Sequence, residues 1–208
     1  LHSRKTAEQD GVVFLEGVRL CEDALLSGMK PVMILFTDTK KALASDWCER
    51  FSIPSETEFL SMSQDLFERL AGTENPQGAA MVVESPLLKQ EIPFRGIVLY
   101  LVCEETTDPG NLGTVVRTSD AAGVDGVILV GQTCDPFSVE AVRATMGSLF
   151  AMPIAEAGFE GFNAWRKTAG ARMVAASMRG THAHDKADYG PRSIVLMGNE
   201  QSGLPPDV

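Results

Sequence analysis

Three loops in the second half of the chain carry residue types that suit ligand binding at the ends of strands. They span residues 108–117, 177–180 and 198–204, and each follows a short apolar run. The third loop combines two glycines, Gly198 and Gly203, with the carboxylate of Glu200. Glycine allows the backbone to approach a ligand closely. A glycine turn on a plain scaffold explains any one of these loops, so the prediction of a site depends on all three meeting at one edge.

Residues 97–130 predict the elements that hold the first of these loops. An apolar strand covers residues 97–103, and turn residues follow at 108–110. Helical spacing then places Leu112, Val115 and Val116 on one stripe, with Arg117 off it. Gly123 is placed to end this helix, and residues 127–130 form the next strand. In open parallel sheets ligands bind outside the carboxyl ends of the strands, where the first loop must lie.

The rest of the second half continues the alternation of strands and helices. Ser138 is a candidate cap for a helix reaching about residue 146, and residues 159–167 form another helix. Strands are predicted at 152–155, 173–176 and 194–197. Apolar strands that alternate with helices indicate an α/β fold with a parallel sheet covered on both faces. In such a sheet the three loops emerge at the same edge.

The first 84 residues predict a separate, smaller α/β unit. Strands are expected at 12–15, 32–36 and 79–83, and helices at 16–26 and 40–51. Ser63 is a candidate cap for a further helix that runs to Leu70. Residues 85–95 hold two prolines and no clear period, so they are predicted to be a linker. The expected layout is therefore residues 1–84, the linker, and a second domain at 96–208.

Composition limits the class of protein. The net charge is −10, which argues against broad nonspecific binding to nucleic acid. Residues 161–192 nevertheless hold six basic against two acidic side chains, so either a local basic face or an ordinary solvated surface fits there. No apolar run reaches the roughly 18 residues of a membrane span. The four cysteines have no CxxC spacing, which suits a reducing cytoplasm.

Familiar nucleotide and hydrolase motifs are missing from the sequence. It has no P-loop pattern and no G-x-S-x-G elbow, and residues 110–113 only superficially resemble a dinucleotide fingerprint. His182 and His184 form a pair two residues apart without a third ligand at a sensible spacing. No metal is therefore expected, and a nicotinamide-type Rossmann enzyme is a weak alternative.

Two long stretches closely resemble the signature motifs of a known family. DPGNLGTVVRTSDAAGVDGVIL resembles the first motif of the SpoU-type RNA ribose methyltransferases, in the SPOUT superfamily, and LMGNEQSGL resembles the second. SVEAVRATMGSLFAMPI resembles the stretch between them. FLEGVRLCEDAL and NPQGAAMVV resemble the ribosomal-protein-like, RNA-binding α/β domain that precedes the catalytic domain in ribosomal RNA members. The resemblance covers nearly the whole chain.

The resemblance implies methyl transfer from S-adenosylmethionine to a ribose 2′-hydroxyl of structured RNA. The two-domain layout resembles that of the members that act on ribosomal RNA, so ribosomal RNA is the expected substrate. The resemblance also implies a deep trefoil knot in the second half, which is a rare topology, and a homodimer. The apolar side chains expected to supply the dimer surface are Leu112, Val115, Val116, Met146 and Phe150. Two alternatives stay open: a non-catalytic RNA-binding homologue, and a 2′-O-methyltransferase acting on tRNA.

The motif match also implies which residues form the site. The active-site positions are Asn111, Arg117 and Glu200. The cofactor-binding positions are Ser177, Met178, Gly198, Asn199, Gly203 and Leu204. RNA contacts are expected from Arg4, Lys5, Arg19, Arg117 and Arg143. The family's third motif would follow the second, but the sequence stops at Val208, so the chain is expected to be part of a longer protein.

These residue types fit the implied chemistry. Arg117 is always cationic and forks onto phosphate oxygens, so it could fix the target phosphate and stabilise charge on the 2′-oxygen. Asn111 can both donate and accept hydrogen bonds, which suits orienting a ribose. For Glu200 a direct chemical role and a role in bracing the loop are equally compatible with the sequence.

Overall fold

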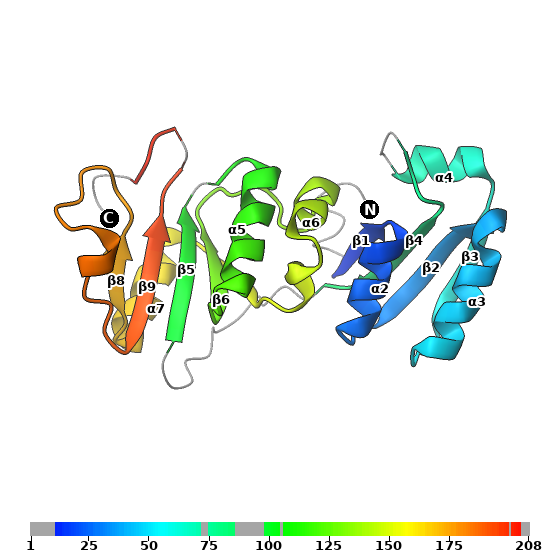
Figure 1. Ribbon diagram of the computed structural model, residues 1–208, viewed down its shortest axis with the longest axis horizontal. Helices are drawn as coiled ribbons and strands as arrows, with labels where there is room; N and C mark the ends of the chain where they lie inside the picture. Colours follow the sequence, from blue (N-terminus) through cyan, green and yellow to red (C-terminus); the bar gives the residue numbers. More distant parts are fainter. Residues whose placement is uncertain (1–10, 72–74, 86–97, 105, 200, 205–208) are drawn as a thin grey trace.

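The structure is a computed structural model that describes residues 11–71, 75–85, 98–104, 106–199 and 201–204. Its described part contains two β-sheets arranged side by side along the long axis of the molecule (Figure 1). The first sheet has four strands in the order β1-β4-β2-β3, and the second has five in the order β7-β6-β5-β9-β8. Within the described residues no helix is long and apolar enough to cross a bilayer.

The first sheet is mixed. Its elements are β1 (Val12–Glu16), α2 (Val18–Leu26), β2 (Pro31–Thr37), η1 (Asp38–Lys40), α3 (Lys41–Arg50), β3 (Glu58–Met62), α4 (Gln64–Ala71) and β4 (Ala79–Glu84). β4 pairs antiparallel with β1 and β2, while β2 pairs parallel with β3. As predicted, Ser63 caps α4, because its hydroxyl accepts a hydrogen bond from the Leu66 amide at 3.3 Å. The edge strand β3 was not predicted.

Helices cover both faces of the first sheet because its central strands are apolar on both sides. On one face, side chains of α2 and α3 such as Cys21 and Trp47 pack against Leu15 and Met81. On the other face, Phe67 of α4 packs against strand residues that include Phe14, Leu35 and Val82. Nearly continuous apolar runs, rather than alternating ones, are what a strand buried on both faces requires.

The second sheet is parallel throughout its described strands. Its elements are β5 (Val98–Glu104), α5 (Pro109–Ala121), β6 (Gly126–Val130), α6 (Val139–Thr145), η2 (Ser148–Phe150), β7 (Ile154–Ala157), α7 (Phe159–Ala169), β8 (Arg172–Ala175), η3 (His184–Lys186) and β9 (Arg192–Met197). Gly123 follows α5 with φ of +70°, in the left-handed region that the sequence predicted for it. The expectation of a parallel α/β sheet is confirmed.

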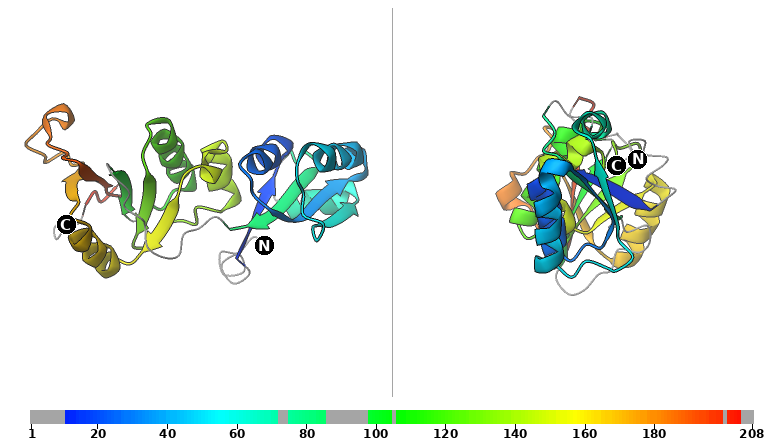
Figure 2. Two further views of the ribbon diagram at one scale, coloured as in Figure 1. Left: turned by 90° about the horizontal axis from the view of Figure 1, so that it is seen from below. Right: turned by 90° about the vertical axis from the view of Figure 1, so that its right-hand side faces the viewer.

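The side chains of β6 alternate between the two faces of this sheet. Val127 and Leu129 pack with Leu112 and Val116 of α5, while Ile128 and Val130 pack with Phe162 of α7. α7 lies on the opposite side of the molecule from α5 and α6 (Figure 2). Leu112 and Val116 are at most 1% exposed, so they are wrong as candidates for an intermolecular surface: they belong to the chain's own core.

The two sheets meet at α6, which lies between α5 and β1 (Figure 1). One hydrophobic cluster spans this junction, since it contains Leu15 of the first sheet together with Val142 and Leu149 of the second part. An ion pair crosses it too. Arg143 Nη2 lies 3.8 Å from Oε2 of Glu16, whose side chain is fully buried. The other oxygen, Glu16 Oε1, accepts a hydrogen bond from the amide of Gln77 at 2.9 Å.

The cysteine positions predict selective alkylation. Cys48 is exposed, whereas Cys21 is fully buried, and that burial, together with the nearby Glu16 and Glu22, raises the pKa of the Cys21 thiol. Because thiolate is the reactive form, Cys21 should resist iodoacetamide at pH 8 in the folded protein while Cys48 reacts. Peptide mass mapping with and without denaturant measures both sites. Labelling of Cys21 at the rate of Cys48 in native protein would contradict this arrangement.

Candidate functional site

The first loop ends in a helix start fixed by Asp108. Its carboxylate Oδ1 accepts a hydrogen bond from the Asn111 amide at 2.6 Å, and Pro109 occupies the first helical position. A capping carboxylate satisfies an amide that the first turn leaves without a partner, and proline there has no amide to lose. α5 therefore begins at Pro109, ahead of the apolar stripe that starts at Leu112, and Asn111 lies in its first turn.

The third loop is a tight turn after β9. The backbones of Asn199 and Gly203 exchange two hydrogen bonds of 3.2 and 2.9 Å. The side-chain oxygen of Asn199 accepts from the amides of Gln201 and Ser202, at 2.9 and 3.1 Å. A Cβ on Gly198 would lie 2.4 Å from the Gly203 carbonyl. Gly198 and Asn199 therefore both shape this turn. Gly198 leaves space for the Gly203 backbone because it has no side chain, and the Asn199 side chain accepts hydrogen bonds from the amides of the turn.

The first and third loops meet in one hollow. Its volume is about 450 Å³, and it is lined by Thr107, Asp108, Pro109, Asn111, Asn199 and Gln201. The two loops follow β5 and β9, which pair as parallel neighbours, so both emerge at the same sheet edge, as predicted. The sequence argument had not singled out Gln201, which takes its place in the hollow from the turn of the third loop. Glu200 lies outside the described residues.

The second loop borders a larger hollow of about 720 Å³. It is lined by Val174, Ala175, Ala176, Ser177, Gly180, Thr181, His182, His184, Lys186, Ala187, Asp188, Tyr189 and Val195. The Ser177 hydroxyl accepts a hydrogen bond from the Arg179 amide at 3.1 Å. Met178 is fully exposed, and Leu204 packs against the cluster under α7. The predicted cofactor residues are thus divided: Ser177 lines the larger hollow, Asn199 lines the smaller one, and Gly198 and Gly203 form the turn.

Arg117 lies apart from Asn111. Six residues on an α-helix correspond to about 9 Å along the axis and one and two-thirds turns, so the two side chains leave α5 on different sides. Arg117 is exposed, and its Nη1 donates a hydrogen bond to Sδ of Met146 at 3.2 Å, just beyond α6. Within the part of the chain that the structure describes, no ion pair joins Arg117 to Asp120. Arg117 therefore faces the α6 side and does not line the hollow with Asn111.

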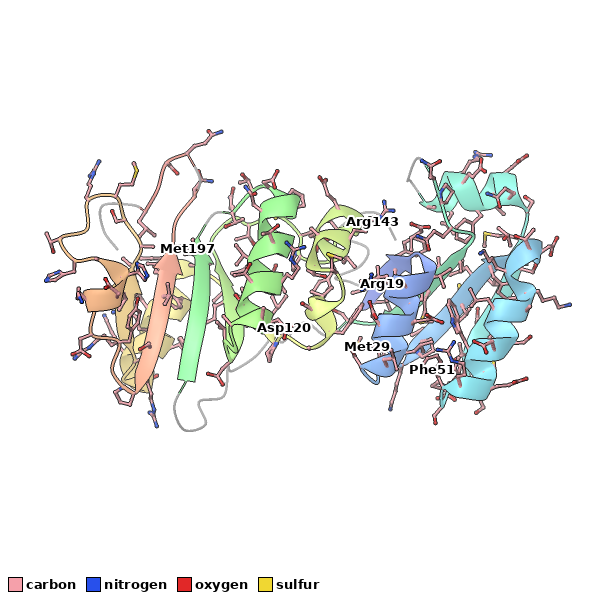
Figure 3. The ribbon with its side chains drawn as sticks, in the orientation of Figure 1. Arg19, Met29, Phe51, Asp120, Arg143 and Met197 are labelled. Atoms are coloured by element: carbon pink, nitrogen blue, oxygen red, sulfur yellow. The ribbon has the colours of Figure 1, made fainter. Side chains whose placement is uncertain are left out.

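The predicted RNA-contacting arginines lie near the junction. Arg19 on α2 is 81% exposed and is 3.9 Å from Asp23, one helical turn on. Arg143 on α6 is about half exposed and pairs with Glu16. Figure 3 places both on the elements that face one another where the sheets meet. Arg4 and Lys5 lie outside the described residues. Arg143 thus also has a structural role, which its position in the sequence did not reveal.

The histidine pair belongs to the loop around the larger hollow. His182 Nδ1 and the Thr181 hydroxyl are 2.9 Å apart, and Tyr189 donates to the carbonyl of His184 at 3.0 Å. Among the residues that the structure describes, no group of three or more His, Cys, Asp or Glu side chains could hold a metal ion. These hydrogen bonds of His182 and His184 thus lie within the loop itself.

Both parts of the chain match known protein families. The pattern of the SpoU rRNA Methylase family matches residues 98–208, and that of the MRM3-like substrate binding domain matches residues 1–80. The 23S rRNA (uridine(2479)-2′-O)-methyltransferase of Streptomyces viridochromogenes is 31% identical over 98% of this chain and 73% of its own length. The 23S rRNA (guanosine(2553)-2′-O)-methyltransferase RlmP of Bacillus subtilis is 28% identical over 98% of this chain and 78% of its own. An AdoMet-bound rRNA methyltransferase from Sinorhizobium meliloti superposes with a TM-score of 0.84 at 35% identity, over 99% of this chain and 77% of that one.

Proposed function

The chain belongs to the SpoU rRNA methylase family, since the family pattern matches more than half of it, and from this we propose that it methylates ribosomal RNA. The reaction is transfer of a methyl group from S-adenosylmethionine to a ribose 2′-hydroxyl. The single observation that carries this assignment is the family match over the part of the chain that contains the three loops. The two curated relatives compared above methylate 23S rRNA, and both align over nearly the whole chain.

The residues of the smaller hollow suit the positioning of a ribose. S-adenosylmethionine supplies a methyl group on a sulfonium, which a hydroxyl must approach in line. Positioning can therefore supply a large part of the catalysis. We assign Asn111 to orienting the ribose, because its amide can donate and accept and its backbone is fixed by Asp108. Glu200 is assigned by the motif match alone, as a catalytic or loop-bracing carboxylate.

Arg117 is proposed to hold the target phosphate. Its planar guanidinium presents several donors, and one of them is already engaged by Met146. An arginine is a poor general base, so its proposed task is to fix the phosphate and stabilise negative charge near the 2′-oxygen. Because Arg117 faces the α6 side, the target nucleotide would have to extend from the hollow across α5 toward α6, or the guanidinium would have to serve another copy's hollow.

The loops after β8 and β9 suit the cofactor. Ligand pockets generally occupy roughly 300–1,000 Å³, and the larger hollow falls in this range. It offers apolar walls from Val174 and Val195 and the hydroxyls of Ser177 and Thr181. Gly198 leaves no room for a side chain, so the turn backbone can approach a ligand directly. Of the six residues that the motif match assigns to S-adenosylmethionine, Ser177 lines the larger hollow. Met178, Gly198, Asn199, Gly203 and Leu204 are proposed to bind the cofactor on the motif match, as members of the two adjacent loops.

Further parts of the assignment follow from family membership. We propose that residues 1–84 bind the substrate RNA, that 85–95 are a linker, most of which lies outside the described residues, and that 96–208 form the catalytic domain. We also propose a trefoil knot in that domain, a homodimer and a cytoplasmic location. Met146, which is 56% exposed, is the one member of the expected dimer surface with substantial exposed area among those that the structure describes. Sedimentation velocity at micromolar concentration measures the oligomeric state directly.

The exposed arginine at the junction gives a test of RNA binding. Replacing Arg19 with alanine should weaken RNA binding and lower the salt slope by about one unit, as expected for one lost phosphate contact. Its ion pair with Asp23 is exposed and long, so its loss should not affect folding. The measurement is fluorescence anisotropy with labelled ribosomal RNA fragments over a range of salt concentrations. An unchanged affinity and slope would remove Arg19 from the RNA surface.

The function itself is tested by mapping 2′-O-methylation in cells with and without the gene. The expected result is loss of one ribosomal RNA methylation, restored by the purified full-length protein and S-adenosylmethionine in vitro. Loss of a tRNA methylation instead would support the tRNA alternative. Tight RNA binding with no methyl transfer and no cofactor binding would identify a non-catalytic homologue.

A further inference from the structure

Met146 has a backbone conformation that its residue type does not favour. Among the described residues, ten glycines have positive φ, and Met146 is the one non-glycine that joins them, with φ of 51° and ψ of 39°. A side chain in the left-handed region strains the backbone, and such strain is kept where the surroundings fix it and often where function needs it. The next residue, Gly147, is also left-handed and is a glycine. The exception at residue 146 therefore calls for a role of its side chain.

The side chain of Met146 reaches Arg117. Its Sδ accepts a hydrogen bond from Nη1 at 3.2 Å, although the two residues are 29 positions apart. The same two helices pack closely at Gly113, one turn before Arg117, where a Cβ would lie 2.4 Å from Cβ of Ala144. A larger residue at 113 would push the helices apart. Met146 follows α6 directly, and its left-handed conformation turns the chain there. At this turn the Met146 side chain contacts Arg117.

The corner that contains Met146 also borders the first sheet. At the adjacent Gly147, a Cβ would lie 3.0 Å from Oδ2 of Asp23 on α2. Earlier in the same helix, Arg143 pairs with the buried Glu16 of β1. The corner at residues 146–147 therefore lies between α5 and the first sheet, and the Met146 side chain, which is 56% exposed, contacts Arg117 there.

We propose that Met146 is a positioning residue for Arg117: its thioether holds one side of the guanidinium so that the remaining donors point at the RNA phosphate. An arginine side chain otherwise loses considerable rotamer freedom on binding, and a pre-set contact reduces that loss. A thioether is a weak acceptor, so it can hold the group without competing with a phosphate for it. This inference rests on the proposed role of Arg117 in methyl transfer.

Three substitutions at Met146 distinguish a role in positioning Arg117 from a role in packing alone. Met146→Gly removes the contact and also relieves the backbone strain, so it should leave the unfolding temperature unchanged or raise it. Met146→Leu keeps the bulk but removes the acceptor. Met146→Gln keeps the length and supplies an amide oxygen that can accept from Nη1. If Met146 merely packs, leucine should behave like the wild type and glycine should destabilise the protein.

The first readout is independent of activity. The heteronuclear NOE of the Arg117 Nε–Hε group should fall in the glycine and leucine variants and stay near the wild-type value in the glutamine variant. The second readout is the rate of single-turnover methylation of ribosomal RNA. The glycine and leucine variants should lower this rate by roughly 10- to 100-fold with unchanged cofactor affinity. The glutamine variant should keep most of the wild-type rate.

Two results would overturn the proposal. One is an Arg117 NOE in the glycine variant equal to that of the wild type. The other is a glutamine variant as impaired as the leucine variant. If the wild type itself does not methylate ribosomal RNA, the proposed function fails, and the NMR comparison still decides whether Met146 holds Arg117.

Discussion

Replacing Arg117 with alanine is expected to lower the single-turnover rate of methyl transfer by roughly 10²–10³-fold, the usual loss when one donor to developing charge is removed. The affinity for S-adenosylmethionine should stay unchanged, because Arg117 lines neither hollow. The fold should also be preserved, since the side chain is exposed and its described contact is the one to Met146. Transfer of a tritiated methyl group, measured beside calorimetric titration of the cofactor, tests all three expectations.

A lysine at position 117 should recover little of the rate, because a point charge does not replace the planar fork of the guanidinium. Lys167→Ala is a control: it removes an exposed cation from helix α7, which lies on the opposite side of the molecule from α5 (Figure 2), and Lys167 lines neither hollow. This control should methylate like the wild type. If Arg117→Ala also transfers methyl groups at a near-normal rate, Arg117 is an ordinary surface residue and its proposed phosphate contact must be abandoned.

The same substitution, glycine to alanine, should have opposite effects in two helices. In α5, a Cβ at Gly113 would lie 2.4 Å from Cβ of Ala144 and 2.6 Å from the carbonyl oxygen of Ala141. Because α6 backbone is among these neighbours, the helices must separate, and overpacking of this kind costs about 1–3 kcal/mol or somewhat more. Gly113→Ala should therefore lower the free energy of unfolding markedly, and by moving α6 it should also slow methylation.

The control for this prediction lies in α7. A Cβ at Gly161 would meet no atom within 4 Å, and the residue has ordinary helical geometry. Gly161→Ala should stabilise the protein by about 0.5–1 kcal/mol, because alanine has the higher helix propensity. Urea unfolding of both variants and the wild type measures the difference. Equal stability of the two variants would contradict the close packing of α5 on α6.

Local signals predicted several helix ends well. Ser63 and Ser138 act as the helix caps that the sequence indicated, and Gly123 ends α5 in the expected left-handed conformation. These outcomes depend on contacts within a few residues, so the sequence carries them directly. The parallel sheet followed from the alternation of apolar runs and helices, and it brought the loops after β5 and β9 to one edge.

Features that depend on distant packing were not predicted. β3 was missed because its residues Phe59 and Leu60 are both substantially exposed at the sheet edge, so they give neither an alternating nor a continuous buried pattern. The partner of Arg117 was missed because Met146 is 29 residues away and meets it only through the close approach of two helices. Leu112 and Val116 were predicted to lie on an apolar surface for a second copy of the chain, but the sheet of their own chain covers them.

The shared hydrophobic cluster at α6 limits how this protein can be recombined. Its apolar side chains come from both sheets, and the pair formed by Arg143 and Glu16 crosses the same boundary. A chimera that joins the first 84 residues to the catalytic half of a relative would replace one side of that cluster and leave the buried carboxylate of Glu16 facing a foreign residue. Successful exchange of the first unit should therefore require the α6 residues that meet it, Val142 and Arg143 among them, to be matched to the new sheet, rather than a simple cut in the connecting segment.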